Sequence, residues 1–400
     1  MSEGTAGKIV AGTPAFRRAN VAVFSCGFSI FATLYCPQPI LPLLTQEFGI
    51  TPAESSLAVS LPCITLAIAM LFASSLSEVF GRKPLMLGAL ALSSILTLAL
   101  YWADSWTQIL WLRALAGITL SGAPAVTLAY LGDEMAPKAV APAVGLYVGG
   151  SAIGGMAGRL ASAAISDAGS WRVSMALIAA AGFVSLLVFW RTMPPSRYFT
   201  ASKASVSVLV RSMFGLFAER TIVLLVVAGF FGLGSFMTLF NYLGFRLQQA
   251  PFELSQATAG LVFLAYPIGS VGSAFFGAQA ARYGRGPVLI FCACCLFVAL
   301  AMMMPDSLIS ITCGLALLTF SFFGAHAICS GWAPAATPHS KAQASSLYLL
   351  LYYVGGGVAG SVGGIFWAWQ GWVGVAMFCG TLMLGILSVG IALNRTAQAR

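Results

Sequence analysis

The chain has 400 residues, of which 59% are hydrophobic and only 8% are charged. About a quarter of the residues in a soluble domain are charged because water must wet its surface, so this composition excludes an ordinary soluble protein. The formal net charge of +9 does not predict nucleic-acid binding, because the basic residues lie at the ends of apolar segments.

Hydropathy divides the chain into apolar segments joined by short polar loops. A transmembrane helix needs about 20 apolar residues, so the length accommodates about twelve of them. In chain order the predicted spans are 21–43, 56–77, 85–103, 107–131, 143–165, 172–190, 221–245, 257–279, 287–304, 308–332, 343–366 and 372–393. The sequence therefore predicts an all-α membrane protein with twelve transmembrane helices.

The distribution of Lys and Arg predicts the orientation of these spans. When the N-terminus is placed inside, 16 of the 20 basic residues fall at the termini or in inner loops. These are Lys8, Arg17, Arg18, Arg82, Lys83, Lys138, Arg191, Arg197, Lys203, Arg211, Arg220, Arg282, Arg285, Lys341, Arg395 and Arg400. Only Arg172 and Arg246 fall at outer ends. This bias is the positive-inside pattern of an even number of spans, so both termini are predicted to be cytoplasmic.

The loop after the second span carries a charged turn that ends in Glu78-Val-Phe-Gly81-Arg82-Lys83-Pro84. Gly81 permits a tight reversal of the chain. Arg82 and Lys83 anchor the inner face, and Glu78 can pair with them or lie at the N-terminus of a neighbouring helix.

Small residues recur along the fifth span, at Gly150, Gly154, Gly155 and Gly158. Small residues four apart allow two membrane helices to approach closely. We expect this stripe to be a packing surface that acts as a hinge or seal.

A linker rich in Pro, Ser and basic residues divides the sequence at 191–220. Its part from Val206 to Phe217 has apolar residues at helical spacing, which predicts an amphipathic helix on the inner membrane face. The linker separates an N-terminal half (21–190) from a C-terminal half (221–393), and short tails, 1–20 and 394–400, flank them.

The two halves repeat one another. Phe31-Ala-Thr-Leu-Tyr35, Gly81-Arg82-Lys83-Pro84 and Tyr147-Val-Gly-Gly150 return later in the chain at offsets of 205, 203 and 206 residues. Three matches in order at a nearly constant offset predict a six-plus-six duplication. Paired pseudo-symmetric halves are typical of transporters.

These motifs resemble those of the major facilitator superfamily. The turn at 74–84 is similar to its loop signature, Arg113 to Gly117 is similar to its R-x-x-x-G motif, and Gly150 to Arg159 is similar to its antiporter motif. The resemblance implies the major facilitator fold. It also implies a conformational latch of Glu78, Gly81, Arg82 and Lys83, with Asp133 or Glu134 as the partner, and it implies export. Residues 34–42, 122–126 and 154–160 resemble the YnfM-type inner-membrane permeases of the drug and arabinose efflux group.

Two basic residues, Arg113 and Arg159, lie within predicted spans, about 12–14 Å below the outer ends of their helices at 1.5 Å per residue. Ionisable groups at this depth are functional hypotheses by default. In one interpretation the guanidiniums bind an anionic substrate. In the other they bond helix carbonyl groups, and Arg159 extends toward the outer water.

Uncharged polar residues complete a candidate substrate cavity: Tyr35, Gln38, Asn241, Tyr242, Tyr352 and Tyr353. Helix–helix hydrogen bonding or anchoring at the membrane interface is the alternative role for each. His326 is the only group within a span that titrates near neutral pH. It is a candidate for proton coupling, or a packing residue near the inner end of its span.

No nucleotide-binding loop occurs in the sequence, so ATP is not the predicted energy source. We expect no enzymatic activity, no catalytic residues, no metal and no cofactor. The predicted function is proton-linked export of small organic molecules, drug-like or sugar-like, by a monomer in a bacterial-type inner membrane through alternating access. The expected partners are a small-molecule substrate, protons and the lipid bilayer. The alternative is uptake or exchange of a small anionic metabolite bound by Arg113 and Arg159.

Overall fold

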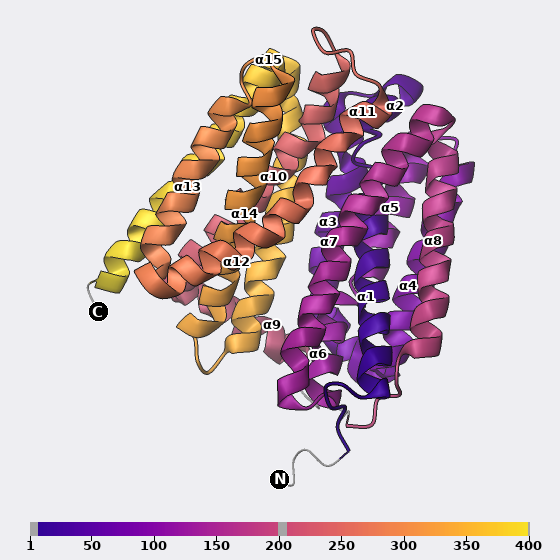
Figure 1. Cartoon of the computed structure of the whole chain (residues 1–400), viewed down its shortest axis with the longest axis vertical. Helices are drawn as coiled ribbons and strands as arrows, with labels where there is room; N and C mark the ends of the chain where they lie inside the picture. Colours follow the sequence, from indigo (N-terminus) through magenta and orange to yellow (C-terminus); the bar gives the residue numbers. More distant parts are fainter. Residues whose placement is uncertain (1–6, 199–205, 399–400) are drawn as a thin grey trace. The chain divides into compact units, whose positions relative to one another are not determined.

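The computed structural model describes residues 7–198 and 206–398, which are helical almost throughout (Figure 1). Side chains at 74, 75, 206–209 and 397–398 are not described. Three parts of the sequence predictions lie outside the described residues: the start of the N-terminal tail, the middle of the linker with Lys203, and Arg400.

The described residues form two compact units. Unit 1 comprises Met1–Pro37 with Ile68–Val206, and unit 2 comprises Gln38–Ala67 with Ser207–Arg400. The segment 38–67 thus packs with unit 2, although it precedes the linker. It does so because its backbone meets glycines of the last long helix: a Cβ on Gly357 would lie 2.8 Å from the Ser60 carbonyl oxygen, and one on Gly364 would lie 2.3 Å from the Cα of Ala53.

Unit 1 is built from helices that pack along their length. Its helices are α1 (Pro14–Tyr35), the second part of α3 (Pro52–Phe80), α4 (Arg82–Ala99), η2 (Leu100–Trp102), α5 (Trp106–Leu120), α6 (Pro124–Glu134), α7 (Pro137–Ala168) and α8 (Trp171–Thr192). In this unit α1 lies against α7 and α8, and α4 lies against α5 and α8.

Unit 2 has the same general construction. It contains α2 (Leu41–Phe48), the first part of α3, α9 (Val206–Gly215), η3 (Leu216–Ala218), α10 (Arg220–Gln248), α11 (Gln256–Gly260), η4 (Leu261–Ala265), α12 (Tyr266–Tyr283), α13 (Arg285–Met302), α14 (Leu308–Ala336) and α15 (Lys341–Gln398). Helices α9 and η3 fall in the linker where an amphipathic helix is expected. Met213 on α9 and Leu216 on η3 are buried, whereas Phe214 on α9 and Phe217 on η3 are exposed. Their position on the membrane stays a prediction.

Ten helices in the described part of the chain are long and apolar enough to cross a membrane. One of them, α15, is two helices joined at a break at Gln370 and Gly371, where Gly371 has a φ of 53°. The 22-residue α1 is a further span, more polar because Arg17, Arg18 and Asn20 lie in its first turns. Counted this way, the described residues contain the twelve expected spans.

Two of the predicted spans have different boundaries in the structure, because prolines interrupt their helices. The span expected at 21–43 begins at Pro14, where the Thr13 side chain accepts a hydrogen bond from the Phe16 N–H, and its helix ends at Tyr35. It ends there because the chain continues as Cys-Pro-Gln-Pro, and proline cannot donate an N–H to the preceding turn. The span expected at 107–131 is likewise two helices, α5 and α6, separated just before Pro124.

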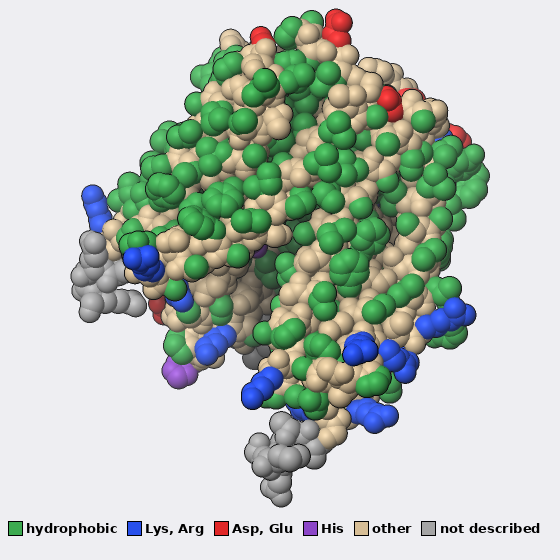
Figure 2. Space-filling view, in the orientation of Figure 1, with side chains coloured by type: hydrophobic (Ala, Val, Ile, Leu, Met, Phe, Trp, Pro, Cys, Tyr) green, Lys and Arg blue, Asp and Glu red, His purple; other side chains and the backbone are tan. Residues whose placement is uncertain are grey.

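The surface of each unit fits a bilayer (Figure 2). On the face shown, hydrophobic side chains cover the middle of each unit, most Lys and Arg side chains gather at one end, and Asp and Glu side chains lie at the other. Large apolar side chains such as Ile309, Val184 and Trp111 are 79%, 62% and 66% exposed. In water such exposure would be unfavourable, but lipid chains cover it in a membrane.

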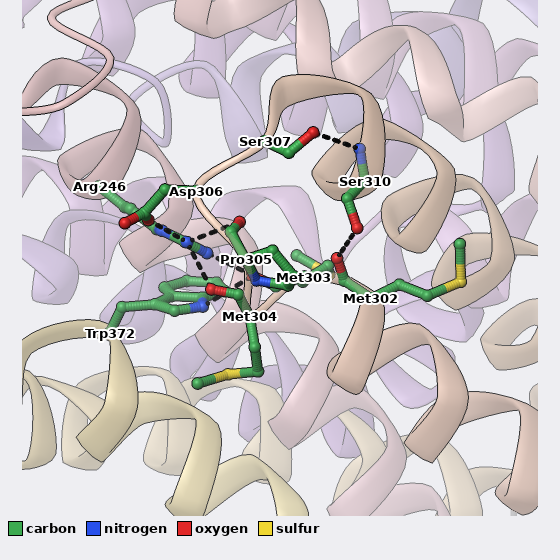
Figure 3. A network of polar contacts seen from close by, with 9 residues as sticks. All are labelled: Arg246, Met302, Met303, Met304, Pro305, Asp306, Ser307, Ser310 and Trp372. Atoms are coloured by element: carbon green, nitrogen blue, oxygen red, sulfur yellow. Dashed lines mark hydrogen bonds and ion pairs between the residues drawn. The ribbon is translucent and has the colours of Figure 1, made fainter.

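A network around Arg246 joins three elements of unit 2 (Figure 3). Arg246 was expected at the outer end of its span; it lies in the last turn of α10 and is only 7% exposed. Its Nη2 donates to the carbonyl oxygens of Met304 at 2.9 Å and Pro305 at 3.1 Å and pairs with Asp306 at 2.8 Å. Its Nη1 and the Trp372 indole N–H both donate to the Met303 carbonyl oxygen. Because Met303 is the C-cap residue of α13 and the other two carbonyls follow it, Arg246 caps that helix and ties it to α10 and α15.

An Arg246→Gln variant should lower the stability of the protein by about 2 kcal/mol, since it removes charge-assisted bonds to three carbonyls, of which that of Met303 is buried. Thermal unfolding followed by tryptophan fluorescence would measure the loss. Asp306→Asn is the matched control, because the Asp306 side chain is 64% exposed and an exposed ion pair contributes little. Equal losses in the two variants would contradict a capping role for Arg246.

Candidate functional site

Arg113 on α5 is completely buried in unit 1 and bonds the end of α1. Its Nη1 donates to the Thr33 carbonyl oxygen at 3.0 Å, and its Nη2 donates to the Leu34 carbonyl oxygen. Within a continuous helix the Thr33 carbonyl would accept from the residue four positions later, but that residue is Pro37, which has no N–H. The guanidinium therefore satisfies carbonyls that the break after Tyr35 leaves without helix partners.

Arg159 on α7 is also completely buried and lies beside the same helix end. Its guanidinium carbon is 4.1 Å from the centroid of the Tyr35 ring, and its Nη1 donates to the Gly155 carbonyl oxygen at 2.8 Å. A Cβ at position 155 would lie 3.2 Å from this Nη1, so glycine there leaves room for the guanidinium. The structure thus brings Tyr35, Arg113 and Arg159 together at the end of α1.

The glycines expected to form a packing surface place α7 directly on α1. A Cβ on Gly150 would lie 2.4 Å from the Phe24 carbonyl oxygen, one on Gly154 2.1 Å from that of Phe28, and one on Gly158 2.7 Å from that of Ala32. Gly155 faces Arg159 instead. The same arrangement recurs in unit 2, where a Cβ on Gly355 would lie 2.3 Å from the Phe230 carbonyl oxygen.

The polar residues predicted for the cavity that lie in unit 2 include a pair of hydrogen-bonded amide side chains and a tyrosine that bonds a neighbouring helix. Gln38 donates to the Asn241 side-chain oxygen at 2.7 Å, and both residues are buried. Tyr242 donates to the Gly360 carbonyl oxygen at 3.0 Å, which fits the helix–helix alternative rather than a place on a cavity wall. Gln256, which was not singled out from the sequence, donates to the Pro39 carbonyl oxygen at 2.6 Å and accepts from Gln248. No local pattern could have indicated this contact, because Gln256 and Pro39 are 217 residues apart.

His326 lies on α14 within an aromatic cluster of unit 2. Its Nδ1 is 3.1 Å from the Tyr348 hydroxyl, and its ring centroid is 4.4 Å from that of Tyr352. Tyr353 is adjacent on α15 and 8% exposed. A cavity of about 10 Å³ borders His326 and Tyr348, which is about the space that one water molecule requires. The sequence did not indicate Tyr348, although it shares a helix face with Tyr352, four residues on.

The charged turn after α3 forms one ion pair. Only some of the residues that the resemblance implied for the conformational latch take part in it. Gly81 has a φ of 85°, which favours glycine, and Arg82 follows at the start of α4. The Arg82 Nε lies 2.7 Å from Oδ2 of Asp133 at the end of α6. Within the described residues Glu78, half-buried at the end of α3, makes no hydrogen bond or ion pair. Asp133 is therefore the residue that pairs with Arg82.

Glu134 and Lys83 bind the segment that leaves α8. Oε1 of Glu134 accepts hydrogen bonds from the Ser196 hydroxyl and from the backbone N–H groups of Arg197 and Tyr198, at 2.7–3.0 Å. Lys83 donates to the Met193 carbonyl oxygen at 2.6 Å. Glu134 is therefore not the partner of Arg82 that was expected as one alternative. It binds the segment after α8, whereas Asp133, one residue earlier, faces α4.

A double-mutant cycle with Arg82→Met and Asp133→Leu should give a coupling energy of about 1 kcal/mol. We expect this value because the pair is partly buried and its hydrogen bond is charge-assisted. Thermal unfolding of the wild type, both single variants and the double variant would measure it. Glu134→Gln in place of Asp133→Leu should give no coupling with Arg82→Met, and coupling there would contradict the assignment.

Comparison with known proteins defines the class. The sequence profile of the Major Facilitator Superfamily matches residues 23–360, and the chain belongs to this family. Its members are transporters rather than enzymes, and the all-α fold of twelve transmembrane helices predicted from the sequence is confirmed. The protein is a multi-pass membrane transporter.

Individual relatives refine this assignment. The chain is 44% identical to the inner membrane transport protein YnfM of Escherichia coli over 388 residues, covering 97% of this chain and 93% of the relative. It is 37% identical to the MFS-type transporter YybF of Bacillus subtilis, covering 97% and 96%. The fold matches the crystal structure of a D-xylose-proton symporter with a TM-score of 0.73 at 14% identity, covering 92% and 97% of the two chains. The resemblance to YnfM-type permeases is confirmed.

Proposed function

We propose that the chain is a secondary transporter of a bacterial inner membrane that exports small organic molecules in exchange for protons by alternating access. The observation that carries this proposal is the direct contact of Gly150, Gly154 and Gly158 with the α1 backbone. These glycines belong to the stretch of α7 that resembles the family's antiporter motif. We propose that both termini face the cytoplasm and that the monomer is the functional form.

The contact between α1 and α7 gives the motif a mechanical role. Because backbones this close cannot separate gradually, α1 and α7 move as one body. Tyr35, Arg113 and Arg159 all lie on or against these two helices. A movement of α1 with α7 would therefore carry this buried cationic cluster with it. This supports a substrate site that is open in turn to each side of the membrane, as alternating access requires.

His326 is the proposed proton-coupling group. The acidic residues of the described chain lie at helix ends or in loops, which leaves this histidine as the candidate within a span to carry a proton. The Tyr348 hydroxyl and the adjacent small cavity offer a hydrogen-bonded route for that proton. Both lie within unit 2.

A His326→Gln variant should weaken proton movement linked to substrate while leaving exchange of labelled for unlabelled substrate intact. Exchange requires only that the loaded transporter reorients, whereas net antiport requires that a proton is bound and released. Proton flux and exchange would be measured in the same proteoliposomes. His339→Gln is the control, since that histidine lies in a loop. A wild-type proton flux in the His326 variant would exclude the proposed role.

The substrate can be sought by reconstituting the protein in liposomes that contain the pH indicator pyranine. Compounds of three classes would be added in turn: small carboxylates, neutral sugars and lipophilic cations such as ethidium. The proposal predicts that at least one class causes a change in internal pH that empty liposomes lack. A transported compound that causes no pH change would contradict proton linkage.

The second candidate function is uptake or exchange of a small anionic metabolite. It is favoured by the burial of two guanidiniums, those of Arg113 and Arg159, beside one tyrosine. Guanidinium groups recognise carboxylates through paired hydrogen bonds. This function predicts that only the carboxylates bind and that Arg159→Lys weakens their binding. Binding of lipophilic cations alone would exclude it.

A further inference from the structure

An apolar groove runs between α4 and α8 in unit 1, with a volume of about 540 Å³. Its walls are Leu87, Gly88 and Ala91 on α4, and Phe183, Leu187 and Trp190 on α8. Gly88 is responsible for part of the hollow, because no heavy atom lies within 4 Å of the position that its Cβ would occupy. The groove faces outward, and the Trp190 side chain is 57% exposed.

Basic residues stand at one end of both walls. Lys83 precedes Leu87 by four residues on α4, and Arg191 follows Leu187 by four residues on α8, so each lies one turn from a wall residue on the same helix face. Arg18 joins them, because its Nη2 donates to the Arg191 carbonyl oxygen at 3.2 Å. Trp190 connects the two regions: its side chain lines the groove and its carbonyl oxygen accepts from Lys83 Nζ at 3.2 Å.

These cations also cap α8, but capping does not neutralise them. Lys83 and Arg18 donate to the last carbonyls of that helix, which favours positive charge there. Within residues 7–198 and 206–398, none of Arg18, Lys83 and Arg191 forms an ion pair with an Asp or Glu. Three positive charges therefore remain where the apolar groove ends, and we expect lipid headgroups to meet water at this end of the two helices.

From this arrangement we infer that the groove is a binding site for an anionic phospholipid. An acyl chain lies along the groove between α4 and α8, and the phosphate lies against Lys83, Arg191 and Arg18. Charge complementarity selects the occupant: a basic group between membrane helices attracts anionic headgroups. A zwitterionic lipid would fill the same groove without this preference.

The test uses Trp190 as a reporter in bilayers of phosphatidylcholine. Phosphatidylglycerol with brominated acyl chains, which quench tryptophan fluorescence, is added at increasing mole fraction, and brominated phosphatidylcholine is the reference. Quenching of Trp190 is the difference between the wild type and Trp190→Phe. Since each Lys or Arg near the surface contributes about a fivefold preference for anionic lipid, we expect brominated phosphatidylglycerol to act at fractions at least about fivefold lower.

Two variants distinguish binding of the lipid headgroup from binding of the acyl chain. Arg191→Gln should reduce the preference about fivefold without changing quenching by brominated phosphatidylcholine. Gly88→Leu fills the groove and should reduce quenching of Trp190 by both lipids. Gly145→Leu on α7 is the matched control, because its Cβ also meets no heavy atom within 4 Å, and it should change neither. Equal quenching by the two brominated lipids in the wild type would overturn the inference, as would a preference that Arg191→Gln leaves unchanged.

Discussion

A Gly154→Ala variant is expected to lose about 3 kcal/mol of stability and to lose transport with it, since overpacking a close contact costs about this much. The added methyl group would lie 2.1 Å from the Phe28 carbonyl oxygen and 2.5 Å from its Cα. Both atoms belong to the α1 backbone, so a side-chain rotation cannot relieve the clash. The helices must separate along the contact that we propose moves as one body.

Gly149→Ala is the control for this prediction. Gly149 lies on the same helix, yet no heavy atom lies within 4 Å of its Cβ position. Because alanine favours a helix by about 1 kcal/mol over glycine, this variant should be as stable as the wild type or more stable. Thermal unfolding and substrate flux would be measured for both. A Gly154→Ala protein with normal unfolding and flux would show that the contact is not needed.

An Arg113→Gln variant should lose about 3 kcal/mol of stability, since an unsatisfied buried carbonyl at Leu34 costs about 1–3 kcal/mol and the Thr33 carbonyl keeps only a weak donor, the Cys36 Sγ at 3.3 Å. The shorter neutral side chain cannot reach both Thr33 and Leu34 across from α5. The end of α1 at Tyr35 should loosen, and the position of the Tyr35 ring against Arg159 should change with it. Thermal unfolding in the absence of any substrate measures the stability directly.

This experiment also distinguishes the two roles considered for the buried arginines. Loss of stability without substrate supports the structural role, in which the guanidinium satisfies the carbonyls of α1. Normal stability together with lost binding of small carboxylates would instead favour the anionic-metabolite function and contradict our prediction. Gln108→Ala, near the start of the same helix, serves as the control, because the Gln108 side chain accepts only from the Asp104 N–H in the preceding turn.

Features that depend on a local pattern of residues could be predicted from the sequence. The apolar spans, the turn at Gly81 and the stripe of small residues on α7 follow from composition and spacing, because each is decided within one or two helices. The helix break after Tyr35 was also present in the sequence, in Pro37 and Pro39, but hydropathy averages over such a break and places one span across it.

Contacts across the chain could not be predicted in the same way. Arg113 bonds carbonyls 79 and 80 residues away, and Gln38 bonds Asn241 at a separation of 203 residues. No local pattern encodes such partners, because they depend on which helix faces meet. The choice of Asp133 over Glu134 as the partner of Arg82 depends on the rotation of α6, which shifts by about 100° per residue. The grouping of 38–67 with unit 2 has the same origin.

Direction of transport under a reversed pH gradient tests the central claim most directly. Once a transported compound is known, protein of one orientation in proteoliposomes is supplied with that compound on its cytoplasmic side, and a gradient is imposed with the other side acidic. The account predicts that the compound accumulates on the acidic side, opposite to proton flow, and that reversing the gradient reverses accumulation. Accumulation on the side that protons enter would show symport and contradict proton-linked export.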